Sequence, residues 1–160
     1  IESFNGQFPD ISFRKSEFEI KEIQDSNRKR HDELKNDLAS LKKAESLADP
    51  DLIEPYSPLD LTVSGVAEMI VPLLEELADK YPVAQRNTTG LLIYFNLSSV
   101  SIEDSPADSI MKVDGGWQSV SVVGNDWAYV FHATIDAPEF IRQHCGRLAL
   151  NEKCWDASAI

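Results

Sequence analysis

The sequence predicts an α/β fold in which a mixed β-sheet is flanked by helices. Two segments carry apolar residues at helical spacing, and short apolar runs typical of strands lie before and after them. Of the 160 residues, 42% are apolar and 26% charged, as expected for one globular domain with its own core. We therefore expect a single domain over residues 1–160.

The first part of the chain predicts a β-hairpin, a helix and a loop. Asp10 to Phe13 and Glu17 to Ile23 are rich in Ile and Phe, and a polar turn at residues 14–16 separates them. From about residue 27 to residue 48, leucines form a narrow apolar stripe among many charges, which predicts a half-exposed helix. Residues 49–58 contain three prolines and predict a loop.

The middle of the chain predicts a core helix followed by a central strand. Apolar residues from Val66 to Leu77 repeat on one helical face, with Pro72 expected to kink the helix and Pro82 to end it. Leu91 to Leu97 is a nearly continuous apolar run, which indicates a strand covered on both faces. We place this strand centrally in the sheet.

The last part predicts two strands and a short helix. Trp117 to Val123 and Ala128 to Ala133 flank residues 124–126, whose Gly-Asn-Asp sequence suits a hairpin turn. Asp136 is predicted to cap a helix that ends at Gly146 in the left-handed conformation. The predicted order of elements is β, β, α, α, β, β, β, α.

The first hairpin carries a group of residues with metal-binding chemistry. Residues two apart on a strand point to the same side, so Glu19 and Lys21 are expected on one surface, with Phe18 and Ile20 facing the core. Pairing of the two strands brings Asp10 near Glu19. Two carboxylates and the Ile20 carbonyl then form an oxygen-rich site suited to Mg²⁺. Lys21 would orient a water beside it or stabilise its deprotonated form.

A structural interpretation of the same residues stays open on the sequence alone. Asp10 also suits a turn, and Glu19 and Lys21 also suit the solvent face of an edge strand, where charged residues are common.

Pro9, Asp10, Glu19 and Lys21 resemble the motif of the PD-(D/E)xK, or restriction-endonuclease-like, superfamily. The chain also resembles a bacterial family of about this size whose members are described as candidate endonucleases. The segments that carry this second likeness are PDISFRKSEFEIKEIQD, LLIYFNL, GWQSVSVVG and APEFIRQHCG.

These resemblances imply a Mg²⁺-dependent nuclease acting on the phosphodiester bonds of DNA. Asp10, Glu19 and Lys21 would be catalytic, and Asp10, Glu19 and the Ile20 carbonyl would hold the metal. In the superfamily a helix and a strand precede the Asp, and that helix often donates another acidic residue. Eight residues precede Pro9 here, so we expect the N-terminal helix of that fold to be absent from this chain.

The net charge of −12 restricts how this chain could bind nucleic acid. Phosphate binding needs locally clustered cations, and Arg28, Lys29 and Arg30 form one such patch, although a charged run also suits a solvated helix start. The alternative function is a catalytically inactive acidic protein with a nuclease-like fold that binds a protein partner.

We expect a cytoplasmic protein that does not span a membrane. Acidic residues interrupt the longest apolar helix, so no run reaches the roughly 20 apolar residues of a membrane span. No charged-then-apolar leader follows Ile1, and the two cysteines suit free thiols in a reducing compartment. The oligomeric state stays open.

Overall fold

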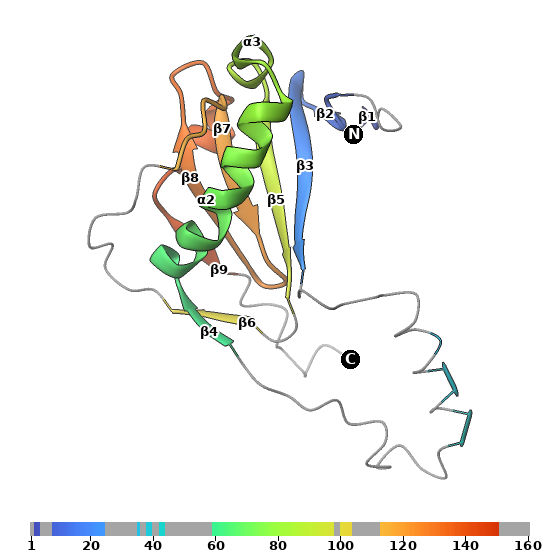
Figure 1. Cartoon of the computed structure of the whole chain (residues 1–160). Helices are drawn as coiled ribbons and strands as arrows, with labels where there is room; N and C mark the ends of the chain where they lie inside the picture. The colour runs from blue at the N-terminus through green and yellow to red at the C-terminus, as the bar shows by residue number, and fades with distance from the viewer. Residues whose placement is uncertain are drawn as a thin grey trace.

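A seven-stranded mixed sheet forms the centre of the computed structural model (Figure 1). The structure describes residues 2–3, 8–24, 59–97, 100–103 and 113–150, with helical backbone also at residues 35, 38–39 and 42–43. Strands β3, β5 and β7 are parallel to one another, and the remaining neighbours in the sheet are antiparallel. In order across the sheet, the strands are β1 (Glu2–Ser3), β2 (Ile11–Phe13), β3 (Ser16–Gln24), β5 (Gly90–Asn96), β7 (Ser119–Val123), β8 (Trp127–Ala133) and β9 (Leu148–Leu150).

Helix α2 (Val63–Lys80) lies across one face of this sheet (Figure 1). It begins where the Thr62 hydroxyl accepts a hydrogen bond from the Gly65 N–H at 3.1 Å, an N-cap that satisfies one free helical donor. The helix continues through Pro72 and stops before Pro82, which confirms the predicted core helix. The shorter helices are α3 (Val83–Arg86) and α4 (Glu139–Arg142). A separate parallel pair consists of β4 (Leu59–Thr62) and β6 (Val100–Glu103).

The main core fills the space between α2 and the sheet. Alternate residues of β5, namely Leu91, Ile93 and Phe95, are buried on the α2 face, while Leu92 and Tyr94 on the other face are half-buried. The prediction of a central strand is confirmed, with one face more deeply covered than the other. The remaining core residues are Val63, Val66, Ala67, Ile70, Leu74, Leu77, Tyr81, Leu97, Val113, Trp117, Val120, Val122, Trp127 and Tyr129.

Both predicted hairpins are present. Arg14 and Lys15 connect β2 to β3 with φ values of 49° and 67°, which is the left-handed backbone of a tight two-residue hairpin turn. The β7–β8 hairpin turns at residues 124–126, where the Gly124 N–H donates to the Trp127 carbonyl at 2.8 Å. Pairing of Ile11 with Phe18 sets the register of the first hairpin and so the position of Asp10.

The prediction that Glu19 and Lys21 face away from the core is wrong, whereas Phe18 is buried, as predicted, on the opposite face. Glu19 and Lys21 pair in register with Leu91 and Ile93 of β5, so they share the face that α2 covers. Glu19 is buried on this core side, whereas Ile20 points to the opposite face and is half-buried. The sequence suggested the reverse because acidic and basic residues normally face solvent. The interpretation of Glu19 as a solvent-facing residue is excluded by its burial.

The predicted start of the last helix is also wrong. Helix α4 is a single turn with Pro138 at its N-cap position and no side-chain capping hydrogen bond, so Asp136 does not cap it. Gly146 does adopt the left-handed conformation, with φ 73°, but it lies in the turn that leads into β9. Its N–H donates to the Val130 carbonyl at 2.9 Å.

Three predictions fall wholly or mostly outside the described residues. They are the helix at residues 27–48, the loop at residues 49–58, and the basic patch of Arg28, Lys29 and Arg30. Across the part of the chain that the structure describes, no helix is both long enough and apolar enough to cross a membrane.

Close packing around Gly90 gives a first prediction. A Cβ atom at this position would lie 2.7 Å from Phe18 Cδ1 and 2.8 Å from Ser119 Oγ. Gly90→Ala is therefore expected to lower the free energy of unfolding by about 1–3 kcal/mol, because overpacking forces neighbouring groups to move. Denaturant titration measures the change.

Gly65→Ala provides the matched control. A Cβ atom there would meet its nearest neighbours at 3.6 Å, an ordinary contact. Because Ala is favoured over Gly in a helix, this variant should be as stable as the parent or up to about 1 kcal/mol more stable. An equal loss in both variants would contradict the packing argument.

Candidate active site

The candidate site lies where β3 continues beyond its hairpin partner. Pairing with β2 ends at Phe18, and no other described strand pairs with that edge of β3. The backbone of Ile20 therefore needs other hydrogen-bonding partners. Its N–H donates to Asp10 Oδ2 at 2.8 Å, and its carbonyl accepts from Lys21 Nζ at 3.0 Å. Asp10 is thus held against β3 by the strand itself.

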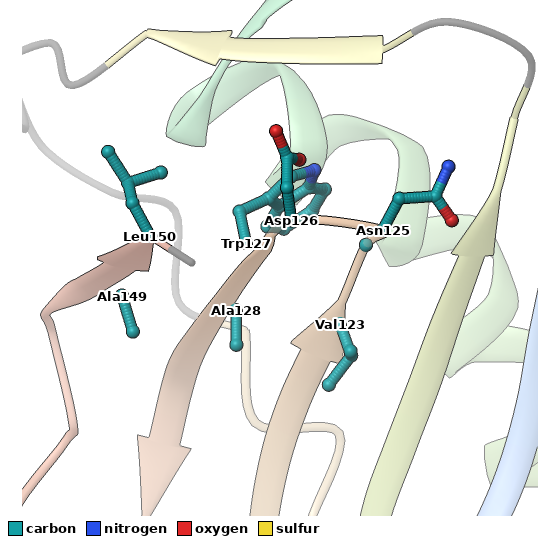
Figure 2. Close-up of a pocket in the computed structure, with 8 residues that line it drawn as sticks. Val123, Asn125, Asp126, Trp127, Ala128, Ala149 and Leu150 are labelled. Atoms are coloured by element: carbon teal, nitrogen blue, oxygen red, sulfur yellow. The ribbon is translucent and has the colours of Figure 1, made fainter. Parts of the chain in front are cut away.

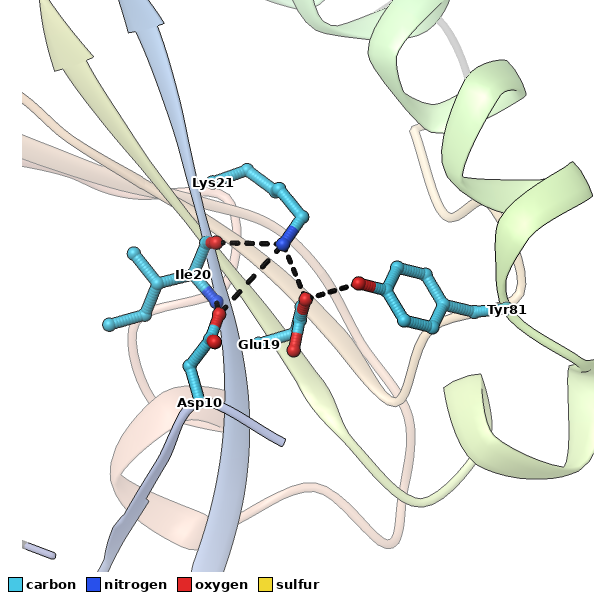
Figure 3. A network of polar contacts seen from close by, with 5 residues as sticks. All are labelled: Asp10, Glu19, Ile20, Lys21 and Tyr81. Atoms are coloured by element: carbon cyan, nitrogen blue, oxygen red, sulfur yellow. Dashed lines mark hydrogen bonds and ion pairs between the residues drawn. The ribbon is translucent and has the colours of Figure 1, made fainter. Parts of the chain in front are cut away.

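Three oxygen atoms of the site converge on one ammonium (Figure 3). Lys21 Nζ contacts Asp10 Oδ2 at 3.8 Å, hydrogen-bonds the Ile20 carbonyl, and forms a short ion pair with Glu19 Oε1. The three side chains differ in burial, with exposed fractions of 31% for Asp10, 22% for Lys21 and 3% for Glu19. The site therefore opens to solvent on the Asp10 side and ends in a buried carboxylate.

Tyr81, the residue that follows α2, completes the contacts of Glu19. Its hydroxyl donates to Glu19 Oε1 at 2.5 Å (Figure 3). Burial, together with the hydrogen bond to Glu19, raises the pKa of the Tyr81 phenol above its ordinary value of 10.0. Tyr81 is therefore a hydrogen-bond donor throughout the neutral pH range.

The second oxygen of the same carboxylate is left unpaired. Glu19 Oε2 is buried and has no hydrogen-bonding partner among the described residues, whereas Oε1 accepts from both Lys21 and Tyr81. A buried carboxylate oxygen without a partner is unfavourable, because it has lost its water without gaining a donor or a cation.

The oxygen donors of this site fit a hard divalent cation. Mg²⁺ takes carboxylate, carbonyl and water oxygens, and Asp10, Glu19 and the Ile20 carbonyl supply such atoms around a position that a cation already occupies. Among the described residues, no group of three or more His, Cys, Asp or Glu side chains could hold a metal. A metal here would therefore rest on two carboxylates and a backbone carbonyl.

The structure brings together Asp10, Glu19, Ile20 and Lys21, all singled out from the sequence. Sequence reasoning missed Tyr81, which is 62 residues from Glu19 along the chain. No motif marks it. The one available signal is its place just before Pro82 at the end of a predicted core helix, where an aromatic residue is ordinarily assigned to packing.

Other hollows of the described surface lack this chemistry. One of about 330 Å³ lies at the β7–β8 turn, beside Trp127, Ala149 and Leu150 (Figure 2). Its amide, Asn125, accepts a hydrogen bond from Tyr94 at 3.2 Å. A second, mainly apolar hollow of about 250 Å³ lies under α4 and includes Phe140. Neither contains paired carboxylates with a lysine.

The fold and the site define an α/β protein with a mixed sheet and a carboxylate–lysine centre on an edge of its third strand. The chain belongs to the family described as "Putative endonuclease, protein of unknown function (DUF1780)", which it matches over residues 1–155. The predicted resemblance to a family described as candidate endonucleases is confirmed, and membership of the PD-(D/E)xK superfamily stays a prediction. No curated protein matches the chain.

One solved structure is similar in fold. It is a protein of unknown function from Pseudomonas aeruginosa strain PAO1, described as belonging to the Monooxygenase Superfamily. The two chains are 22% identical with a TM-score of 0.63, and the match covers 93% of this chain and 68% of the other. At this identity the similarity shows the fold alone, a mixed sheet flanked by helices.

The burial of Glu19 gives a second prediction. Glu19→Ala should lower the free energy of unfolding by about 1–3 kcal/mol, because it leaves the Tyr81 hydroxyl and the Lys21 ammonium without their shared acceptor. Chemical denaturation of the two proteins measures the difference.

Glu17→Ala is the control on the same strand. Glu17 is exposed, so its removal should change stability by no more than about 0.5 kcal/mol. If Glu19→Ala has as small an effect as Glu17→Ala, the buried network contributes no net stability.

Proposed function

We propose that this protein is a Mg²⁺-dependent nuclease that hydrolyses phosphodiester bonds of DNA at the Asp10–Glu19–Lys21 site. The observation that carries the proposal is the convergence of Asp10 Oδ2, Glu19 Oε1 and the Ile20 carbonyl on one cation, the Lys21 ammonium. The family description, which names endonucleases, supports the same class of reaction.

Each residue of the site has a role in this proposal. Asp10, Glu19 and the Ile20 carbonyl hold the metal, and a bound Mg²⁺ supplies the positive charge that a phosphodiester needs as its own negative charge develops. The Lys21 ammonium is suited to orient the attacking water and to stabilise its deprotonated form. The partly exposed Asp10 lies on the side from which a phosphate group reaches the site.

We further propose that the sheet is the core of the PD-(D/E)xK, or restriction-endonuclease-like, superfamily. In support, the Asp precedes β2, the Glu-x-Lys sequence lies on β3 of the same hairpin, and β3 is parallel to the central strand β5. The monooxygenase description of the structural neighbour gives no residue-level support for an oxygenase reaction here, since the likeness at 22% identity concerns the fold.

A cleavage assay tests the proposal. The parent protein, with Mg²⁺ or Ca²⁺, is expected to cut at least one of linear, circular or single-stranded DNA or RNA. Glu19→Gln and Lys21→Ala should each reduce the rate by at least about 100-fold, as removal of a charge-stabilising group typically does. Glu17→Gln and Lys15→Ala, which alter exposed residues of the same hairpin, should retain the parent's rate. Full activity in both site variants would place the reaction elsewhere.

A second candidate function rests on the same ion pairs. Lys21 pairs with both carboxylates, so the site can offset part of its negative charge without a metal. An inactive nuclease-like protein with a net charge of −12 would suit a basic protein partner. A parent protein that neither binds nor cleaves any of the four nucleic-acid substrates would favour this alternative.

The basic patch of Arg28, Lys29 and Arg30 gives a further test of the nucleic-acid proposal. We expect it to supply the phosphate contacts of an otherwise acidic protein. Replacing all three residues by Ala should remove most of the DNA affinity. It should also lower the slope of log affinity against log salt by about 2.7, at roughly 0.9 per phosphate contact.

A salt titration of both proteins on one duplex measures this change. The matched control replaces three exposed lysines with helical backbone by Ala, namely Lys35, Lys42 and Lys43. It changes the net charge by the same amount. Equal losses in the two triple variants would show that net charge, and not a local patch, determines the affinity.

A further inference from the structure

Tyr81 lies outside the motif but contacts its innermost residue. Its hydroxyl donates to Glu19 Oε1 at 2.5 Å, although the two residues are 62 positions apart in the chain. Lys21 Nζ, which bonds the same oxygen, lies 5.7 Å from the centre of the Tyr81 ring. The hydroxyl therefore shares one acceptor with the lysine of the site.

The position of Tyr81 is fixed from several sides. Its N–H donates to the Leu77 carbonyl at 2.9 Å as the last bond of α2, and its carbonyl accepts from Arg86 Nε at 3.0 Å. Its ring packs against Phe8 and Trp117, with centroid distances of 4.9 and 5.8 Å. Both the backbone and the ring are thus held independently of Glu19, and the hydroxyl is a preset donor.

The Tyr81 hydroxyl restricts rotation about the last torsion of the Glu19 side chain. The terminal torsion of a glutamate is loosely determined, so either oxygen of the carboxylate could approach Lys21. With Tyr81 and Lys21 both bound to Oε1, the carboxylate plane is fixed and Oε2 is left unpaired inside the protein. That unpaired oxygen is the atom of the site that most lacks a positively charged partner.

We propose that Tyr81 is a positioning residue, which fixes the Glu19 carboxylate so that the Asp10–Glu19 site binds a divalent cation. This inference rests on the proposed metal site and adds a residue from α2 to it. Tyr81 acts through Glu19, and it contacts neither the phosphodiester nor the attacking water.

Metal binding by Tyr81→Phe tests the inference without an activity assay. Phe keeps the ring that packs against Phe8 and Trp117 and removes only the hydroxyl. The probe is Mn²⁺, which takes the same oxygen ligands as Mg²⁺ and whose free concentration is measured by electron paramagnetic resonance. We expect the Kd of the variant to rise about 10-fold or more, as is typical when a partner of a metal ligand is lost. Its far-ultraviolet circular dichroism should match the parent's, which shows that the fold is kept.

Tyr94→Phe is the matched control. The Tyr94 hydroxyl bonds Asn125 at 3.2 Å, away from the site, so this variant should bind Mn²⁺ as the parent does. A Kd for Tyr81→Phe within twofold of the parent's would overturn the positioning role while leaving the proposed function intact. A parent protein that binds no Mn²⁺ would overturn the metal site itself, and the inference with it.

A second measurement uses the parent protein, so it tests the inference even if Tyr81→Phe does not fold. With tyrosine labelled with ¹³C at Cζ, four resonances are expected, from Tyr56, Tyr81, Tyr94 and Tyr129. Single Phe variants at the other three positions identify the Tyr81 signal. Saturating Mg²⁺ should shift that resonance and leave the Tyr94 resonance in place, and an unmoved Tyr81 resonance would contradict the proposal.

Discussion

The interaction on which the site depends is the pairing of the buried Glu19 carboxylate with Lys21 and Tyr81. Parallel pairing of β3 with β5 places Glu19 beside Leu91, on the face that α2 covers, where a carboxylate is costly unless it is paired. Lys21 lies two residues further along the same strand and supplies the opposite charge, while Tyr81 at the end of the helix supplies a neutral donor. Helix, strand and site are therefore coupled through one side chain.

The position of Asp10 depends on where the pairing of β2 with β3 ends. Because β2 pairs with β3 no further than Phe18, the backbone of Ile20 is free to accept and donate outside the sheet, and Asp10 takes its N–H. The two-residue turn at Arg14 and Lys15 sets this register. A hairpin longer by two residue pairs would place Pro9 opposite Ile20 and draw Asp10 into the strand, so the short β2 is a condition of the site and not an imperfection of the sheet.

The arrangement also relates the two candidate functions to one another. Lys21 contacts the same two carboxylates and carbonyl that would hold a divalent cation, so a metal and the ammonium would compete for these groups. With the ammonium there, one positive charge partly offsets the two carboxylates, as in an inactive binding protein. With a metal there, Lys21 would lose these oxygens as partners and would be available to orient a water. The two hypotheses thus differ in which cation the carboxylates prefer, which is a measurable affinity.

The sequence by itself determined most of the local elements of this protein. Period-two and helical apolar patterns, together with turn residues, predict both hairpins, α2 and the central β5, because such features depend on neighbours in the chain. The hairpin also predicts that Asp10 lies near Glu19. Only the tertiary structure decided on which face of β3 the Glu19 side chain is buried. Alternation along a strand defines two faces, but the position of α2 on the sheet determines which of them Glu19 shares with Leu91 of β5. The tertiary structure alone brought Tyr81 to Glu19, because a contact across 62 residues leaves no local pattern in the sequence.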